Sequence, residues 1–144
     1  MHYHGHVKKQ TNVTKAIKQL VCLAALSIAL PTFAGETTPA AQLDFWEKAA
    51  GQPGNPSRGQ TFFTQKHGEQ WACASCHGAP PIKAGEHADT GKRIKPLAPA
   101  YNTVGFTKQG KTDKWFRRNC NDVVGRECTP SEKSDVLSYL INIK

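Results

Sequence analysis

Three absences narrow what this chain of 144 residues can be. Its only methionine is Met1, so the body of the chain offers no thioether side chain as a metal ligand. The longest apolar run, residues 20–30, holds 11 residues and is interrupted at Ser27, whereas a membrane-spanning helix needs about 20. No segment alternates apolar and polar residues over the length of a strand, so we expect helices and loops rather than a sheet.

Residues 1–34 are typical of a cleavable secretory signal. Four lysines between positions 8 and 18 precede the apolar run without any acidic residue, and small residues occupy positions 32 and 34, just before the expected cleavage point. Cys22 lies near the start of the apolar run, so we do not expect it to carry a lipid. Residues 35–144 would form one domain, exported to the periplasm, with no membrane span after cleavage.

The net charge of the exported domain is modest. Loss of the four lysines lowers the formal net charge from +8 to +4. Such a weak balance indicates neither a nucleic-acid partner nor a membrane surface.

The chemistry of the chain centres on Cys73-Ala74-Ser75-Cys76-His77. Cys-x-x-Cys-His is the attachment signature of c-type haem: two thiols form thioethers with the porphyrin vinyl groups, and the adjacent imidazole becomes the proximal iron ligand. A thioredoxin-like pair would follow a strand of a βαβ unit, which this chain lacks. Half a zinc site would need a second close cysteine pair, and Cys120 and Cys128 are too widely spaced. We therefore predict one covalently bound haem c.

Two cysteines, Cys120 and Cys128, remain in the exported domain once the haem pair is set aside. In an exported domain such a pair favours a disulfide over two free thiols. The loop between them is short, so the bond would contribute about 2–3 kcal/mol to stability.

Capping signals predict three helix starts. Thr38-Pro39 and Asn55-Pro56 each place a capping residue before a proline at the first helical position, and Thr129–Glu132 is a capping box that opens the last helix. Gly59 with Phe63 and the segment Leu137–Leu140 resemble the helix crossing of the class I cytochrome c fold. In that fold a glycine of an N-terminal helix meets an aromatic residue of the C-terminal helix, and the missing side chain lets the two backbones cross closely. We predict an all-α, class I cytochrome c-like fold of about four to five helices around the haem.

Glycines and polar residues indicate where the predicted helices end and where a further helix begins. We expect the first helix to end at Gly51, the second to end at His67-Gly68, and a third to run from Thr112 to Gly125. Residues 79–110 are rich in Pro, Gly, Lys and Thr and show little periodicity. Such a segment is long for an unstructured loop, and wrapping a haem edge is a sufficient reason for it.

The sixth iron position has no obvious occupant, since no methionine follows Met1. His87 lies in a polar loop and His67 near a predicted helix end, so for both a surface role is favoured over ligation. Asn119 and Asn121 flank a cysteine beside an aromatic face, and from the residues alone ligation and local hydrogen bonding are equally well supported. The other side chains with a usable lone pair are those of Lys83, Lys92, Lys95, Tyr101 and Asn102.

Residues 38–142 resemble the Sphaeroides haem protein family, unusual class I-like monohaem cytochromes c that bind oxygen and nitric oxide. The resemblance is densest at Arg58-Gly59, Cys73–Gly78, Thr90–Lys92, Ile94–Pro99, Lys114-Trp115, Arg118–Asn121, Val124–Arg126 and Cys128–Pro130. In that family the asparagine before the first late cysteine is the distal iron ligand, and the two late cysteines form a disulfide. The resemblance therefore implies Asn119 as distal ligand and a Cys120–Cys128 bridge.

An asparagine ligand would make the site sensitive to oxidation state. Its carbonyl oxygen is a hard donor that favours Fe(III) over Fe(II), so reduction would release Asn119 and open a ferrous haem with proximal His77 to O2, NO or CO. The family resemblance also implies electron delivery from a dihaem cytochrome c or a membrane cytochrome b. It leaves oxygen reduction and nitric oxide detoxification open as enzymatic activities, and we expect a monomer.

Two other functions compete with gas binding. A conventional low-spin electron-transfer cytochrome would keep a permanent histidine as sixth ligand, either His87 or His67. A peroxidase-like enzyme needs a distal base and an arginine, and Arg117 or Arg118 would supply only the second. Each arginine is equally well explained as a solvated surface charge.

Overall fold

A computed structural model describes residues 1–2, 36–68 and 70–144. Most of the predicted secretory signal, Cys22 included, lies outside the described residues. In chain order the elements are α1 (Pro39–Ala50), α2 (Pro56–Thr64), α3 (Cys73–His77), β1 (Gly85–Glu86), β2 (Arg93–Ile94), the 3₁₀ helix η1 (Pro99–Tyr101), α4 (Gln109–Val124) and α5 (Pro130–Asn142). Five α-helices and one very short hairpin confirm the predicted all-α class. Within these ranges, no helix has the length and apolarity required to cross a membrane.

The three helix starts predicted at Thr38-Pro39, Asn55-Pro56 and Thr129 are confirmed. The hydroxyl of Thr38 accepts a backbone hydrogen bond from the first turn of α1 at 3.1 Å, and the side chain of Asn55 does the same for α2 at 2.9 Å. At the start of α5 the capping box is reciprocal: the Glu132 N–H donates to the Thr129 hydroxyl at 3.2 Å, and the Thr129 N–H donates to the Glu132 carboxylate at 2.8 Å. Gly51, with φ 69°, ends α1 as predicted.

α2 is shorter than predicted. It ends at Thr64 rather than at His67, because Gln65 takes an extended conformation with ψ 146°. His67 instead pairs with Trp71 in an isolated bridge, its N–H donating to the Trp71 carbonyl at 2.9 Å. Trp71 lies two residues before α3, so this pairing immediately precedes that helix.

α4 begins earlier than predicted, at Gln109 rather than at Thr112, and ends at Gly125 as expected. Thr112 is buried, and its hydroxyl donates to the Lys108 carbonyl four residues earlier at 3.3 Å. A hydroxyl that bonds backwards along the helix does not cap it, so the prediction that Thr112 starts this helix was wrong.

The segment 79–110, predicted to lack strands, contains a minimal hairpin. β1 and β2 pair antiparallel with Gly85 opposite Ile94. β1 lies directly on α3, because a Cβ atom at Gly85 would overlap the carbonyl oxygen of Cys76. Two residues per strand are too few to show alternation in the sequence.

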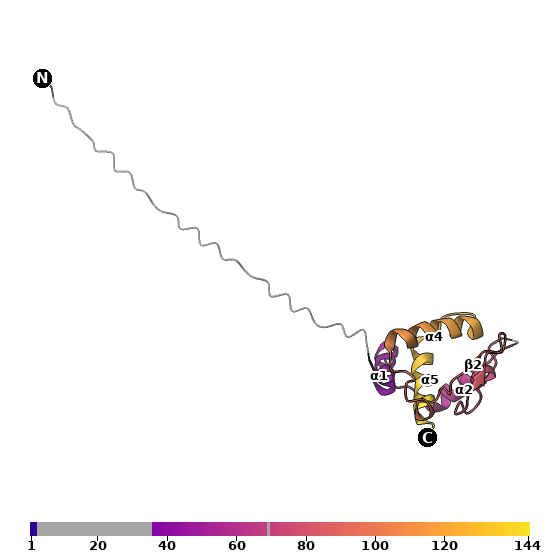
Figure 1. Cartoon of the computed structure of the whole chain (residues 1–144). Coiled ribbons are helices and arrows are strands. Elements are labelled where there is room, and N and C mark those ends of the chain that lie inside the picture. Colours follow the sequence, from indigo (N-terminus) through magenta and orange to yellow (C-terminus); the bar gives the residue numbers. More distant parts are fainter. Residues whose placement is uncertain (3–35, 69) are drawn as a thin grey trace. The chain divides into compact units, whose positions relative to one another are not determined.

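The core forms around α5, in which residues 133–140 are all buried. Figure 1 shows α5 lying between α1 and α2. A Cβ atom at Gly59 of α2 would overlap the carbonyl oxygen of Asp135, so the two backbones cross where only glycine fits. The rings of Phe63 and Tyr139, 5.6 Å apart between centroids, pack beside this point. The predicted crossing is therefore present, with its closest approach at Asp135.

Candidate haem site

α3 presents two thiols and an imidazole in little more than one helical turn. Cys73 and Cys76 are three residues apart and so share one face of the helix. The hydroxyl of Ser75 accepts a hydrogen bond at 3.0 Å from the backbone N–H that precedes the helix. His77 is the last helical residue, and Gly78, with φ 74°, turns the chain away from it. The local sequence therefore holds the motif as a rigid unit.

Burial sets the protonation of this motif. It raises the pKa of the Cys73 thiol to about 11 and lowers the pKa of His77. His77 is thus neutral at pH 7, the form that binds metals. A thioredoxin-like pair would need a thiol whose pKa is lowered, whereas the pKa of Cys73 is raised. Cys73 and Cys76 are not bonded to each other.

One buried polar atom of the motif lacks a partner. Nδ1 of His77 makes no hydrogen bond within the described residues, although the ring packs near Phe63 with centroids 6.2 Å apart. A half-buried, neutral imidazole beside two available thiols fits a covalently attached haem. The Sγ atom of Cys76 also lies 3.3 Å from the Ala88 N–H, which draws the hairpin tip toward the attachment helix.

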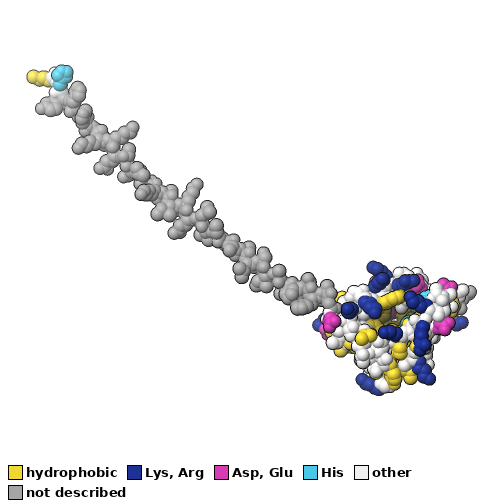
Figure 2. Space-filling view, in the orientation of Figure 1, with side chains coloured by type: hydrophobic (Ala, Val, Ile, Leu, Met, Phe, Trp, Pro, Cys, Tyr) yellow, Lys and Arg dark blue, Asp and Glu magenta, His cyan; other side chains and the backbone are white. Residues whose placement is uncertain are grey.

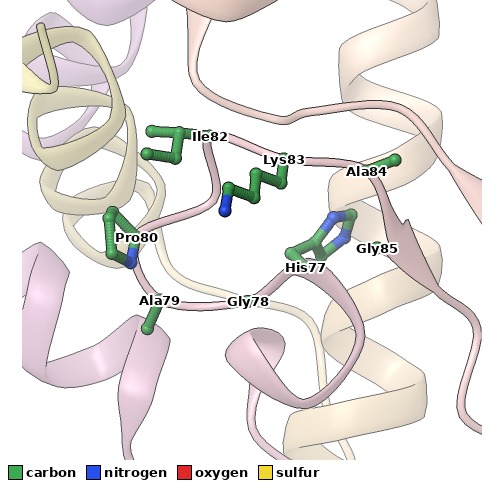
Figure 3. Close-up of a pocket in the computed structure, with 8 residues that line it drawn as sticks. All are labelled: His77, Gly78, Ala79, Pro80, Ile82, Lys83, Ala84 and Gly85. Atoms are coloured by element: carbon green, nitrogen blue, oxygen red, sulfur yellow. The ribbon is translucent and has the colours of Figure 1, made fainter.

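A pocket of about 340 Å³ opens beside the imidazole. It is lined by His77, Gly78, Ala79, Pro80, Ile82, Lys83, Ala84 and Gly85. Figure 3 shows the Lys83 ammonium group directed into this space, above the ribbon at Gly78. Figure 2 shows Lys and Arg side chains around a hollow on the visible face of the domain, with hydrophobic side chains within it. An apolar floor with a cationic rim suits a porphyrin that carries two carboxylates.

The two asparagines of α4 differ in their surroundings. Asn121 is exposed, and its amide donates to the Arg117 carbonyl one turn earlier at 2.8 Å. Asn119 is half-buried, and its side chain makes no hydrogen bond in the described part of the chain. The local role that the sequence left open for both residues therefore belongs to Asn121 alone. Asn119 retains a full set of donors and acceptors for another partner.

Both histidines considered as sixth ligands are engaged locally. A ring nitrogen of His67 lies 2.8 Å from the Phe62 carbonyl, and the two rings pack with centroids 4.4 Å apart. Nδ1 of His87 accepts backbone N–H groups of Asp89 and Thr90 at 3.3 and 3.4 Å. These contacts fit the surface and turn roles that the sequence favoured.

The structure joins Cys120 to Cys128 in a disulfide, with Cα atoms 5.6 Å apart. The bond ties the turn of α4 that follows Asn119 to the start of α5. Arg118 lies over the exposed ring of Trp115 at 5.7 Å and is therefore held on the outer face of α4.

Sequence reasoning missed Lys133, whose ammonium group lies 4.2 Å from the centroid of the Trp46 ring. A lysine in a helix is ordinarily exposed, so nothing in the sequence marked it. Only the packing of α1 on α5 buries this side chain.

Comparison with known proteins gives consistent matches. Residues 49–140 match the family described as Domain of unknown function (DUF1924). The chain is 44% identical over 117 residues to the cytochrome c-type protein SHP of Cereibacter sphaeroides, a match covering 78% of this chain and 90% of that protein. It is 44% identical over 87 residues to cytochrome c'' of Methylophilus methylotrophus, covering 58% of this chain and 60% of that protein.

The solved structures agree with these relatives. Oxidised SHP, an oxygen-binding cytochrome c, matches with a TM-score of 0.68 and 42% identity, covering 74% of this chain and 97% of that chain. The solution structure of Methylophilus methylotrophus cytochrome c'', which concerns haem-ligand detachment, matches with a TM-score of 0.64 and 34% identity, covering 72% of this chain and 92% of that chain.

These matches confirm the predicted cytochrome c-like fold and cofactor. The protein carries one haem c, bound covalently through Cys73 and Cys76. By sequence and by structure, the chain belongs to the family of the cytochrome c-type protein SHP and to the family described as Domain of unknown function (DUF1924).

Proposed function

We propose that this protein is an exported monohaem cytochrome whose distal ligand, Asn119, leaves on reduction, so that the reduced protein binds O2 or NO. The haem supplies a one-electron redox couple and, when reduced, an iron that binds diatomic gases. Two relatives support the proposal: SHP is an oxygen-binding cytochrome c, and the solution structure of cytochrome c'' concerns detachment of a haem ligand.

The observation that carries the proposal is the unengaged amide of Asn119. Neither His67 nor His87 has an equally available side chain, because each already makes close local contacts. No methionine occurs between residues 2 and 144. Among the residues weighed as distal ligands, Asn119 therefore combines partial burial with a lone pair that nothing else uses.

Each residue of the site has a distinct task. His77 would supply the neutral proximal nitrogen. The amide oxygen of Asn119 is a hard donor, so it would bind the oxidised iron in preference to the less charged reduced iron. When not bound to the iron, the Asn119 amide would offer its NH2 group as a hydrogen-bond donor to a bound gas. The distal pocket's donors then govern whether a bound gas is stored or activated.

The proposal extends to location and redox partner. The predicted signal at residues 1–34 would direct the protein to the periplasm, and electrons would come from a dihaem cytochrome c or a membrane cytochrome b. Consumption of O2 or NO in the presence of such a donor would identify an enzyme, whereas reversible uptake without consumption would identify a gas carrier.

Optical spectra of the purified holoprotein test the ligand exchange. We expect a low-spin spectrum in the oxidised state, a high-spin spectrum after dithionite reduction, and a further change on adding CO. The variant Asn119→Ala should be high-spin in both oxidation states. Its matched control, Asn121→Ala, lies two residues along the same helix and should keep the parent spectra, because its side chain only bonds to the α4 backbone.

A different result would favour the competing electron shuttle. A reduced spectrum that stays low-spin and ignores CO would show a permanent sixth ligand and refute the gated site. In that case His87→Ala or His67→Ala should abolish the low-spin spectrum, and Asn119→Ala should leave it unchanged.

A further inference from the structure

The turn of α4 that bears Asn119 is connected to the core by two chains of contacts that meet at one buried ammonium group. That group belongs to Lys133 in the second turn of α5, whose side chain is only 6% exposed. A buried lysine is costly unless its charge is paired and hydrogen-bonded. Its two contacts satisfy this requirement, and each of them leads back to α4.

The first chain runs through the disulfide. Nζ of Lys133 donates to Oε1 of Glu127 at 2.9 Å. Glu127 immediately precedes Cys128, which is bonded to Cys120. Cys120 is the neighbour of Asn119, so the ion pair fixes the far side of the bridge that restrains the asparagine.

The second chain runs through aromatic rings. The same ammonium group lies 4.2 Å from the centroid of the Trp46 ring in α1, a cation–π contact. Trp46 meets Phe116 of α4 edge to face, with centroids 6.5 Å apart. Phe116 is three residues before Asn119 and therefore on the same side of the helix. The Lys133 ammonium group is therefore linked to the Asn119 turn at two points: at Cys120 through the disulfide, and at Phe116 through the Trp46 ring.

The neighbouring ion pair makes no such connection. Arg126 binds the Glu132 carboxylate at 2.7 and 2.8 Å and supports the capping box of α5. Within the described residues, neither of its side chains forms a hydrogen bond, ion pair or cation–π contact with α1. Of these two ion pairs, Lys133–Glu127 is therefore the one that connects α1, α4 and α5.

From this arrangement we propose that Lys133 is a positioning residue, which holds the Asn119 turn toward the haem pocket and so sets how readily the amide leaves and returns. The proposal rests on the proposed function, because it assigns Lys133 a role in the ligand exchange described there. Lys133 acts through Glu127 and Trp46 and does not itself reach the pocket.

The test compares variants of the mature holoprotein. Lys133→Met keeps the side-chain length and removes the charge, and Lys133→Arg restores a cation. Lys48→Met is the matched control, because Lys48 also forms an ion pair, with Asp44 at 2.6 Å, but on the exposed face of α1. The readouts are the high-spin fraction of the oxidised protein and the midpoint reduction potential.

Lys133→Met should weaken retention of Asn119 in the oxidised state by about 2- to 30-fold, the usual range for a residue that couples to a site without touching it. The midpoint potential should rise by about 20–90 mV, since a tenfold change is about 59 mV for one electron. Lys133→Arg should lie close to the parent protein, and Lys48→Met should equal it. If Lys133→Met does not fold, Glu127→Gln at the exposed end of the pair tests the same contact.

The outcomes separate the two proposals. If Asn119→Ala alters the spin state while Lys133→Met and Glu127→Gln keep the parent spin state and potential, the positioning role is overturned and the proposed function stands. If Asn119→Ala keeps the parent spectra, both proposals are overturned. A potential shift in Lys133→Met that Lys133→Arg reverses, with Asn119→Ala high-spin, supports both.

Discussion

Replacing Gly59 by alanine should destabilise the domain even though alanine is the better helix former. The Cβ atom would overlap the backbone carbonyl of Asp135 rather than the end of a flexible side chain. α5 cannot easily move aside at this point, because the Asp135 carboxylate accepts two hydrogen bonds from Arg58, each at 2.7 Å, and one from the Asn55 N–H at 2.6 Å. These hydrogen bonds join α2 to α5, so relieving the overlap by separating the two helices would stretch or break them.

The expected size follows from two opposing effects. Introducing a methyl group into a filled contact costs about 1–3 kcal/mol, and an overlap with fixed backbone belongs at the upper end. Replacing glycine inside a helix gains about 0.5–1 kcal/mol. The net loss is about 2 kcal/mol. For a domain of about this size each kcal/mol lowers the melting temperature by about 4 °C, so Gly59→Ala should melt about 8 °C below the parent protein.

Thermal unfolding of the holoprotein, followed by circular dichroism, measures this difference. Gly110→Ala is the control, because Gly110 also lies in a helix but a methyl group added there would meet no atom within 4 Å. Removing backbone freedom without a clash should raise its melting temperature by a few degrees. If Gly59→Ala melts at or above the parent temperature, the close approach of α2 and α5 is not as tight as described.

Three further results are expected. Replacing Cys120 and Cys128 together by serine should cost about 2–3 kcal/mol by the loop-entropy model for a separation of eight residues, measured by chemical denaturation, and should raise the high-spin fraction of the oxidised protein. The hydrogen-bonded Arg126 guanidinium lowers the pKa of Glu132 from 4.5 to about 2. The ionised Glu132 carboxylate therefore stabilises the folded state above pH 4.5, and this contribution is lost as the pH falls toward 2. Arg126→Met should flatten this part of the stability–pH curve by about 1–2 kcal/mol, allowing for solvent screening. Cys76→Ser should leave one vinyl group unsaturated and shift the pyridine haemochrome band to longer wavelength, whereas an unchanged band would contradict attachment through Cys76.

The features that the sequence predicted correctly are those encoded within a few neighbouring residues. A capping residue followed by proline marks a helix start regardless of the rest of the fold, which is why α1, α2 and α5 begin where expected. The haem motif is equally local. Helix ends depend more on surroundings: α2 stops early because the chain at His67 pairs with Trp71 instead of continuing the helix.

Features that depend on packing between distant segments were harder to predict from the sequence. Nothing local separates Asn119 from Asn121, and the resemblance to a known family was needed to prefer one; the structure distinguishes them by their burial and hydrogen bonds. Thr112 resembles a cap in sequence but is buried inside α4. The burial of Lys133 requires Trp46 from the other end of the domain, so no window of neighbouring residues reveals it.

The central position of α5 has a consequence for how the holoprotein is made. α1 and α2 bury their apolar faces against a helix that is synthesised after both of them and after the haem motif. A nascent chain that ends at residue 129 contains Cys73 and Cys76 but lacks the buried stretch 133–140 that completes the core. We therefore expect haem attachment to precede completion of the core by α5, at a stage when the two thiols are still accessible.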